Sequence, residues 1–174
     1  MILYHGTSWS IAQMILQEGK IKVCKRERSP YQVNLHERNF TEEGYVYLTD
    51  DENEARVYGS GAVNHWQTLQ IKKGSDIAEE DKWTCIFEIN LAKDELRPDI
   101  NECEIRQNDV FSSRRINKCT ECNIENCLVK IKAVRCPRDL VIGEDVLRYK
   151  LYHVRSKYWH GEEYPQVIKM WSQC

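Results

Sequence analysis

The most regular pattern in the chain is the alternation of apolar and polar residues from Cys85 to Leu91. Cys85, Phe87, Ile89 and Leu91 fall on one side, and this period of two predicts a β-strand. Other short apolar segments have strand character and are separated by long polar stretches. We expect strands at Ile2–Tyr4, Tyr45–Leu48, Cys127–Val134, Arg148–Val154 and Gln166–Trp171. Short strands that are far apart in the sequence and mixed with helices favour an α+β fold.

A helix is expected directly after the first strand. Ser8 or Ser10 can cap its first turn, and Gly19 stands where a glycine usually ends a helix. The apolar residues of this segment share one helical face: Ile11, Met14 and Ile15.

Two further short helices are expected after the Tyr45–Leu48 segment. Asp51, followed by Glu54, can cap the first of them, which carries Ala55 and Tyr58. The second covers Ala62–Ile71.

The size and charge of the chain exclude several classes of protein. Its 174 residues fit a single domain, 1–174, and its 25 basic and 27 acidic residues give a net charge of −2. Bulk charge therefore does not predict nucleic-acid binding, although a local basic groove is compatible with it. No apolar stretch reaches the length of a membrane helix, and no export signal is evident, so we expect a cytoplasmic protein without a membrane partner.

Two spacings carry the chemical interpretation. His5-Gly6-Thr7 follows the first strand, and Gly19 lies fourteen positions after His5. Tyr47 stands in an aromatic, apolar, small, Asp sequence, and Tyr58 lies eleven positions after it. This arrangement resembles the ADP-ribosyltransferase superfamily of the histidine–tyrosine–glutamate type, which includes diphtheria toxin and the poly(ADP-ribose) polymerases. The resemblance covers about residues 2 to 60.

The resemblance implies an ADP-ribosyltransferase-like split β-sandwich with short flanking helices, acting on NAD as substrate. His5, Gly6 and Thr7 would orient the NAD, and the rings of Tyr47 and Tyr58 would enclose the nicotinamide. Taken singly, the histidine has an ordinary polar alternative and the tyrosines an ordinary core alternative.

The family also has a catalytic glutamate near the start of a late strand. Glu125, two residues before Cys127–Val134, is our favoured candidate for it. Glu144, Glu162 and Glu163 are the alternatives, and each is otherwise expected to be a solvated carboxylate.

Cysteines form a second candidate site. Cys119 and Cys122 are separated by two residues and are followed by Cys127, and this spacing lets thiolates reach one tetrahedral zinc ion. The fourth ligand can be Cys103 or Cys136. We take the set Cys103, Cys119, Cys122 and Cys127 as the prediction, with Cys136 as the alternative to Cys103. Ordinary thiols in a loop are the alternative, and a zinc ion here would be structural.

The function implied by the resemblance is a mono-ADP-ribosyltransferase that modifies a macromolecule. The basic residues between Lys20 and Arg28 favour RNA or DNA slightly over protein as acceptor, and the alternative for these residues is a solvated charged loop. Small free-standing relatives are often toxins or defence effectors, sometimes restrained by an antitoxin. The alternatives are a non-catalytic module that binds NAD, ADP-ribose or RNA, and an RNA 2′-phosphotransferase-like enzyme.

Overall fold

The computed structural model describes residues 1–25, 42–72, 74, 76, 78–100, 102–103, 122–154 and 172–174. The predicted strand Gln166–Trp171 lies outside these residues.

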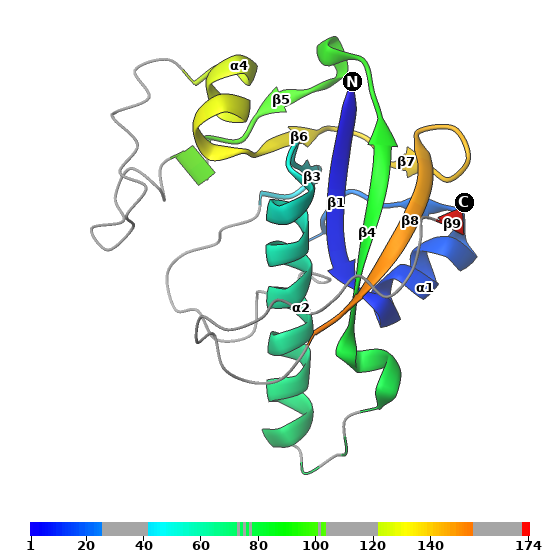
Figure 1. Ribbon diagram of the computed structural model, residues 1–174. Helices are drawn as coiled ribbons and strands as arrows, with labels where there is room; N and C mark the ends of the chain where they lie inside the picture. Colours follow the sequence, from blue (N-terminus) through cyan, green and yellow to red (C-terminus); the bar gives the residue numbers. More distant parts are fainter. Residues whose placement is uncertain are drawn as a thin grey trace.

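The largest sheet has four antiparallel strands in the order β1-β4-β8-β9 (Figure 1). They are β1 (Ile2–Ser8), β4 (Trp83–Asn90), β8 (Val146–His153) and β9 (Ser172–Gln173). The predicted strands at Ile2–Tyr4, Cys85–Leu91 and Arg148–Val154 are confirmed within one or two residues at most ends. The strand β4 is buried on both faces because elements pack on each side of the sheet.

Helix α1 (Trp9–Glu18) follows β1 directly, as predicted. The Ser8 hydroxyl accepts the Ile11 N–H, and Gly19 ends the helix with a φ of 75°. This left-handed backbone favours glycine because it has no Cβ. The buried face carries Ala12 and Ile15, whereas Met14 is 59% exposed, so its predicted place on the buried face is wrong.

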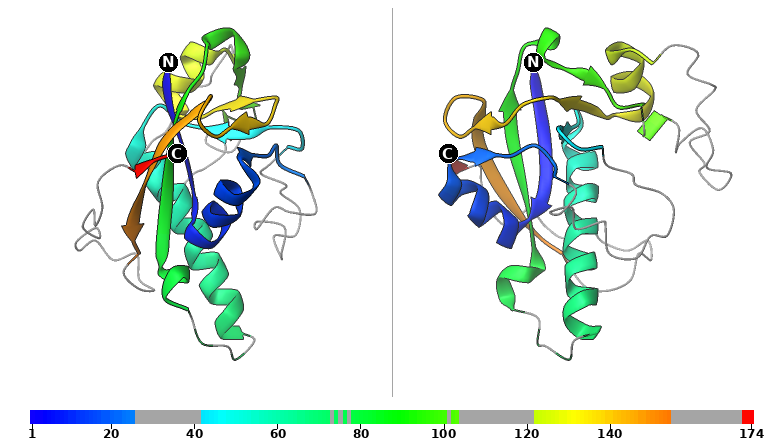
Figure 2. Two further views of the ribbon diagram at one scale, coloured as in Figure 1. Left: turned by 90° about the vertical axis from the view of Figure 1, so that its right-hand side faces the viewer. Right: turned by 180° about the vertical axis from the view of Figure 1, so that it is seen from behind.

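Helix α2 (Glu52–Lys72) is one continuous helix of 21 residues. The prediction of two short helices in this segment is therefore wrong. The prediction that the helices flanking the sheet are short is wrong for α2 as well. Figures 1 and 2 show α2 lying along β1. The contact is so close that a Cβ on Gly6 would stand 1.8 Å from the Ala55 carbonyl oxygen, and one on Gly59 would stand 2.4 Å from the Thr84 side chain. Packing on the sheet thus stabilises a helix whose glycines disfavour it locally.

Two smaller antiparallel sheets complete the sheet structure of the described residues. One has the order β3-β6-β5, with β3 (Val46–Leu48), β6 (Val134–Cys136) and β5 (Arg97–Pro98). The other pairs β2 (Lys20–Ile21) with β7 (Leu140–Val141). Strand β3 confirms the strand predicted at Tyr45–Leu48.

The segment predicted as the strand Cys127–Val134 is mostly helical. Helix α4 (Ile124–Asn126) continues into a wider turn of π-helix, η5 (Cys127–Ile131), and β6 begins only at Val134. Cys127, Leu128 and Ile131 are buried, while Val129 is 74% exposed. Their spacing of one and four residues fits one face of a helix. The sequence alone could not show this, because a short run of apolar residues is compatible with either a helix or a strand. Short 3-10 turns form at η3 (Glu79–Lys82) and η4 (Lys93–Glu95).

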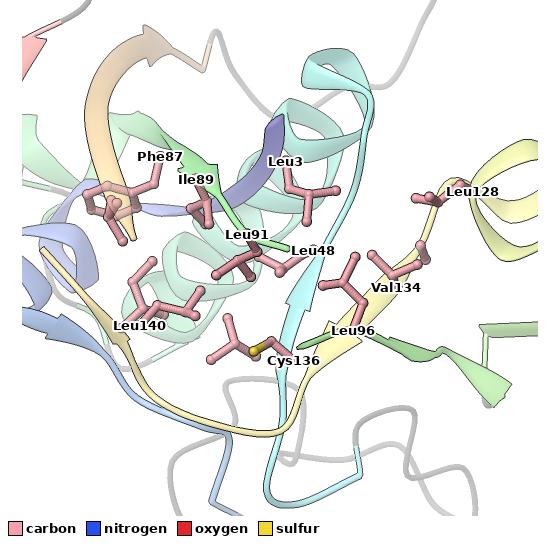
Figure 3. Packing of buried hydrophobic residues seen from close by; sticks show 14 of the residues in the cluster. Leu3, Leu48, Phe87, Ile89, Leu91, Leu96, Leu128, Val134, Cys136 and Leu140 are labelled. Atoms are coloured by element: carbon pink, nitrogen blue, oxygen red, sulfur yellow. The ribbon is translucent and has the colours of Figure 1, made fainter. Parts of the chain in front are cut away.

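The main core lies between the large sheet and the smaller ones. Figure 3 shows Leu3 of β1 and Ile89 of β4 in the same region as Leu48 of β3 and Val134 of β6. Helix α1 closes this side, where Trp9 stacks on Tyr149 with ring centroids 5.8 Å apart. The opposite face of the large sheet packs on α2. The fold is thus mixed α and β with antiparallel sheets, which agrees with the α+β prediction.

Among the described residues, no helix is both long enough and apolar enough to span a membrane.

Candidate functional site

His5 and Tyr47 are brought together by the contact between β1 and β3. Tyr4 and Thr49 exchange backbone hydrogen bonds of 2.7 and 3.0 Å, which fixes the two strands side by side. The His5 Nδ1 then lies 2.9 Å from the Tyr47 carbonyl oxygen. A carbonyl only accepts, so Nδ1 carries the proton and Nε2 is the acceptor in the neutral ring. Burial lowers the pKa of His5 below 6.5, which favours this neutral form at pH 7.

The phenol of Tyr47 is held by the backbone of Glu42. Its oxygen accepts the Glu42 N–H and donates to the Glu42 carbonyl at 3.2 Å. Burial raises the pKa of Tyr47 to about 12, so the phenol is neutral at physiological pH. These two bonds fix the position of the phenol oxygen and thus the direction in which the side chain points.

Tyr58 lies on α2, next to Gly59, the residue that packs against the sheet. Its position one residue before Gly59 turns it to the flank of the helix, and it is 37% exposed. The Tyr58 hydroxyl donates to Glu102 Oε1 at 3.1 Å. A carboxylate that sequence reasoning did not single out therefore holds the second predicted aromatic ring.

At Gly6, helix α2 packs against one face of strand β1, while the backbone groups of this residue lie at the strand edge that faces away from β4. The α2 backbone occupies the space of a side chain, so packing alone requires glycine here. The backbone N–H and C=O of Tyr4 point away from β4 and bond to Thr49. Backbone groups alternate between the two edges of a strand, so the N–H and C=O of Gly6 point to the same edge of β1 as those of Tyr4. Among the described residues, no strand pairs with this edge beyond Tyr4. Thr7 is only 6% exposed.

Arg135 and Asp99 are buried charged residues beside Tyr47 that sequence reasoning missed. Arg135 faces Tyr47 across the β3–β6 pair and is 5% exposed. Its guanidinium lies 4.0 Å from the centre of the Tyr45 ring and pairs with Glu42, while its buried Nε has no hydrogen-bond partner. Burial raises the pKa of Asp99 to about 6. No local pattern signals either residue, because their burial depends on the pairing of β5, β6 and β3.

Glu125 is placed on α4 rather than before a strand. It is an exposed residue whose carboxylate pairs with Lys93, and this ion pair lowers its pKa. It also borders an open depression of about 580 Å³, together with Leu96, Arg97 and Cys122. The contacts that the structure describes for Glu125 do not include His5, Tyr47 or Tyr58.

The alternative carboxylates and the basic segment give little further support. Glu144 is exposed in the turn between β7 and β8, and Glu162 and Glu163 lie outside the described residues. Lys20 pairs with Asp139 at 2.7 Å and Lys22 with Glu18 at 2.8 Å, so both have acidic neighbours.

Three of the four predicted metal ligands converge. The sulfur of Cys122 lies 3.5 Å from that of Cys103 and 3.7 Å from that of Cys127, and the third separation, Cys103 to Cys127, is 3.8 Å. Cys119 lies outside the described residues, and Cys136 is buried in β6 and is not part of the cluster. Burial raises the pKa of the Cys127 thiol to about 11, and burial also raises the pKa of the Cys103 thiol. The three sulfurs could hold a metal ion.

No protein-family model matches this chain, and no curated protein matches it either. The site therefore has to be interpreted from its own geometry.

Proposed function

We propose that the chain is a mono-ADP-ribosyltransferase that consumes NAD. The observation that carries this proposal is the hydrogen bond between His5 Nδ1 and the Tyr47 carbonyl. It joins two residues that are 42 positions apart and leaves Nε2 of the neutral imidazole as a hydrogen-bond acceptor. The helix that carries Tyr58 packs against the same strand at Gly6.

Each residue has a defined task in the proposed reaction. His5 Nε2 accepts a hydrogen bond from a ribose hydroxyl, and the edge N–H and C=O of Gly6 bind the nicotinamide carboxamide. The rings of Tyr47 and Tyr58 cover the faces of the nicotinamide, while Thr7 supports the strand from inside.

The bond that breaks is the one between the nicotinamide nitrogen and the ribose carbon. Nicotinamide leaves as a neutral molecule with the bonding electrons, and positive charge develops on the ribose, as in glycoside cleavage. A nucleophilic oxygen or nitrogen of the acceptor then forms the new bond and loses its proton. A carboxylate that stabilises the developing charge would accelerate this step.

Two carboxylates are candidates for this role. Glu125 remains our candidate from the sequence, but its pairing with Lys93 on exposed α4 does not support it. Glu102, which contacts Tyr58, is the described carboxylate with a direct link to the proposed aromatic pair. The pairing of Glu125 with Lys93 favours a second candidate function, a module that binds NAD or ADP-ribose without turnover.

The acceptor follows only from the basic residues. Nucleic acid is proposed over protein, and within the basic segment Lys20 pairs with Asp139 and Lys22 with Glu18. A role as a toxin or defence effector, with or without an antitoxin, depends on the family resemblance.

We also propose that the metal is a structural zinc ion. Two sulfurs that are each about 2.3 Å from a tetrahedral zinc ion lie about 3.7–3.8 Å from each other. The three sulfur–sulfur separations in the structure, 3.5, 3.7 and 3.8 Å, are close to this value. Cys103, Cys122 and Cys127 would hold the ion, which would stabilise the fold by joining two segments.

Incubation with NAD labelled in the adenylate part tests the enzymatic proposal. We expect transfer of label to RNA, DNA or protein with release of nicotinamide, and a decrease of about 100-fold in His5→Ala and Tyr47→Ala. His153→Ala, which removes a histidine from β8, serves as the matched control and should retain transfer. Binding of NAD without nicotinamide release would support the binding module instead.

A further inference from the structure

The cysteine cluster and the Tyr58 phenol are joined by neighbouring residues of one turn. Cys103 contributes a sulfur to the cluster, and Glu102, directly before it, accepts the hydrogen bond of Tyr58 at 3.1 Å. We propose that a metal ion bound by Cys103, Cys122 and Cys127 fixes the turn that carries Glu102, and thereby holds the Tyr58 ring in its orientation. Glu102 is then a positioning residue that acts through Tyr58.

The first end of this turn is fixed by Asp99. The Glu102 N–H donates to Asp99 Oδ1 at 3.1 Å, and the Cys103 N–H donates to the Asp99 carbonyl at 3.2 Å. Asp99 itself is 4% exposed, so it is anchored in the interior. These bonds set the backbone of the turn, but they leave the side chains of Glu102 and Cys103 to be fixed by other contacts.

The cluster provides the second anchor. Cys122 and Cys127 come from the segment that contains α4, and this segment is closed on itself by the Asn126 N–H, which donates to the Asn123 side chain at 2.9 Å. Thiols alone form only weak hydrogen bonds with one another. Bonds from three thiolates to one ion are far stronger, so the metal would decide how firmly the turn is attached to α4.

Tyr58 is the residue that this attachment affects. Helix α2 is held against the sheet by the close contacts at Gly6 and Gly59, which do not involve the cluster. The Tyr58 side chain, at 37% exposure on the helix flank, is anchored at its hydroxyl by Glu102. Loss of the metal should therefore leave α2 in place and weaken the anchor at the Tyr58 hydroxyl.

Metal analysis of the purified full chain, after addition of Zn²⁺ and removal of the excess, tests the first step. We expect about one zinc ion per chain, retained in Cys24→Ser and lost in Cys103→Ser and in Cys127→Ser. Cys24 is the matched control because it lies outside the cluster. A zinc content near zero in the unmodified protein would overturn the proposal.

The link to Tyr58 is tested by ¹⁹F NMR of the protein labelled with 3-fluorotyrosine, in which Tyr58→Phe identifies the Tyr58 signal. We expect a chelator to shift this signal in the wild type. Glu102→Ala should retain its zinc, show a shifted Tyr58 signal from the start and respond no further to the chelator. Two results would contradict the link. One is a Tyr58 signal that stays unchanged in the wild type when the chelator removes zinc, and the other is a Tyr58 signal that the chelator shifts as much in Glu102→Ala as in the wild type.

Unfolding on chelation would not prevent this test. Glu102→Ala keeps all three cysteines, so its zinc-bound form can be compared directly with the zinc-bound wild type, and an unchanged Tyr58 signal there would overturn the proposal. The importance of the ring orientation for nucleotide binding rests on the proposed function. The coupling itself is measured without NAD, so its failure and the absence of transferase activity are separate results.

Discussion

Gly6 stands where strand β1 and helix α2 approach each other most closely. The position was predicted as a nucleotide contact, yet the structure gives it a packing requirement as well, since a Cβ would stand 1.8 Å from the Ala55 carbonyl oxygen. The polar groups of its backbone still face the edge away from β4. A single glycine therefore combines helix packing on one face with a candidate ligand contact at one edge.

Replacement of Gly6 by alanine should destabilise the fold strongly. The clash is with backbone, which cannot rotate away, so we expect a loss of at least about 3 kcal/mol in the free energy of unfolding. Gly19→Ala is the control: nothing lies within 4 Å of its Cβ position, and only its φ of 75° is unfavourable, which costs about 1–2 kcal/mol. Urea denaturation measures both, and an equal loss in the two variants would contradict the close contact at Gly6.

His5 should make stability depend on pH. Burial lowers its pKa in the folded state below 6.5, so the unfolded chain binds more protons in the acidic range. The stabilisation is complete above pH 6.5 and decreases as the pH falls below this value, toward the folded-state pKa. Denaturation of wild type and His5→Gln between pH 5 and 8 should show a smaller decrease in the variant. Identical pH profiles would contradict a buried neutral imidazole.

The helical turn η5 illustrates what a local apolar pattern cannot decide. From Cys127 to Val134 the residues have strand propensity, and a strand would place Cys127, Val129 and Ile131 on one face. The structure buries Cys127 and Ile131 but exposes 74% of Val129, because the segment winds as a helix before β6. The cysteine cluster lies at the start of this turn and holds it next to Cys103.

Substitutions at Val129 and Ile131 distinguish these two conformations. Val129→Asp should change the free energy of unfolding by no more than about 0.5 kcal/mol, because the residue faces solvent. Ile131→Ala should cost about 2–5 kcal/mol, because Ile131 is 1% exposed. Thermal or urea denaturation provides the comparison, and a large loss in Val129→Asp would support the strand instead.

In the molecule as a whole, β4 is the central structural element. It pairs with β1 over seven residues and with β8 on its other side, and helix α2 covers one face while the main core covers the other. The Arg148 guanidinium of β8 holds the nearly buried Glu88 of β4 with two contacts of 2.8 Å. The proposed NAD site is built on the edge of this rigid sheet, at β1.

Hydrogen exchange should reflect this arrangement. The amides of β4 should be the slowest to exchange, since their opening requires both neighbouring strands to separate, and those of the two-residue edge strand β9 should exchange fastest within the sheet. Exchange followed by mass spectrometry of peptides checks this order. Faster exchange in β4 than in β1 would contradict its central position.

Local chemistry was sufficient to predict the elements whose signals lie within a few residues. The Ser8 cap, the Gly19 terminus and the alternation around Phe87 each act through neighbouring backbone or through a two-residue period, so β1, α1 and β4 followed from the residues alone. The proximity of Cys122 and Cys127 also followed from their spacing, whereas Cys103 was one of two alternatives for a further ligand. Those features are set by short-range sterics and hydrogen bonding, which are the same in any fold.

Tertiary packing decided the rest. Helix α2 continues through Gly59 and Gly61, although each glycine disfavours a helix by itself, because the helix packs on the sheet and Gly59 permits a close approach there. Arg135 becomes a buried neighbour of Tyr47, and Glu102 a partner of Tyr58, only because segments from distant parts of the sequence meet. Contacts at such separations depend on the whole arrangement of the sheets, and no short stretch of sequence contains that information.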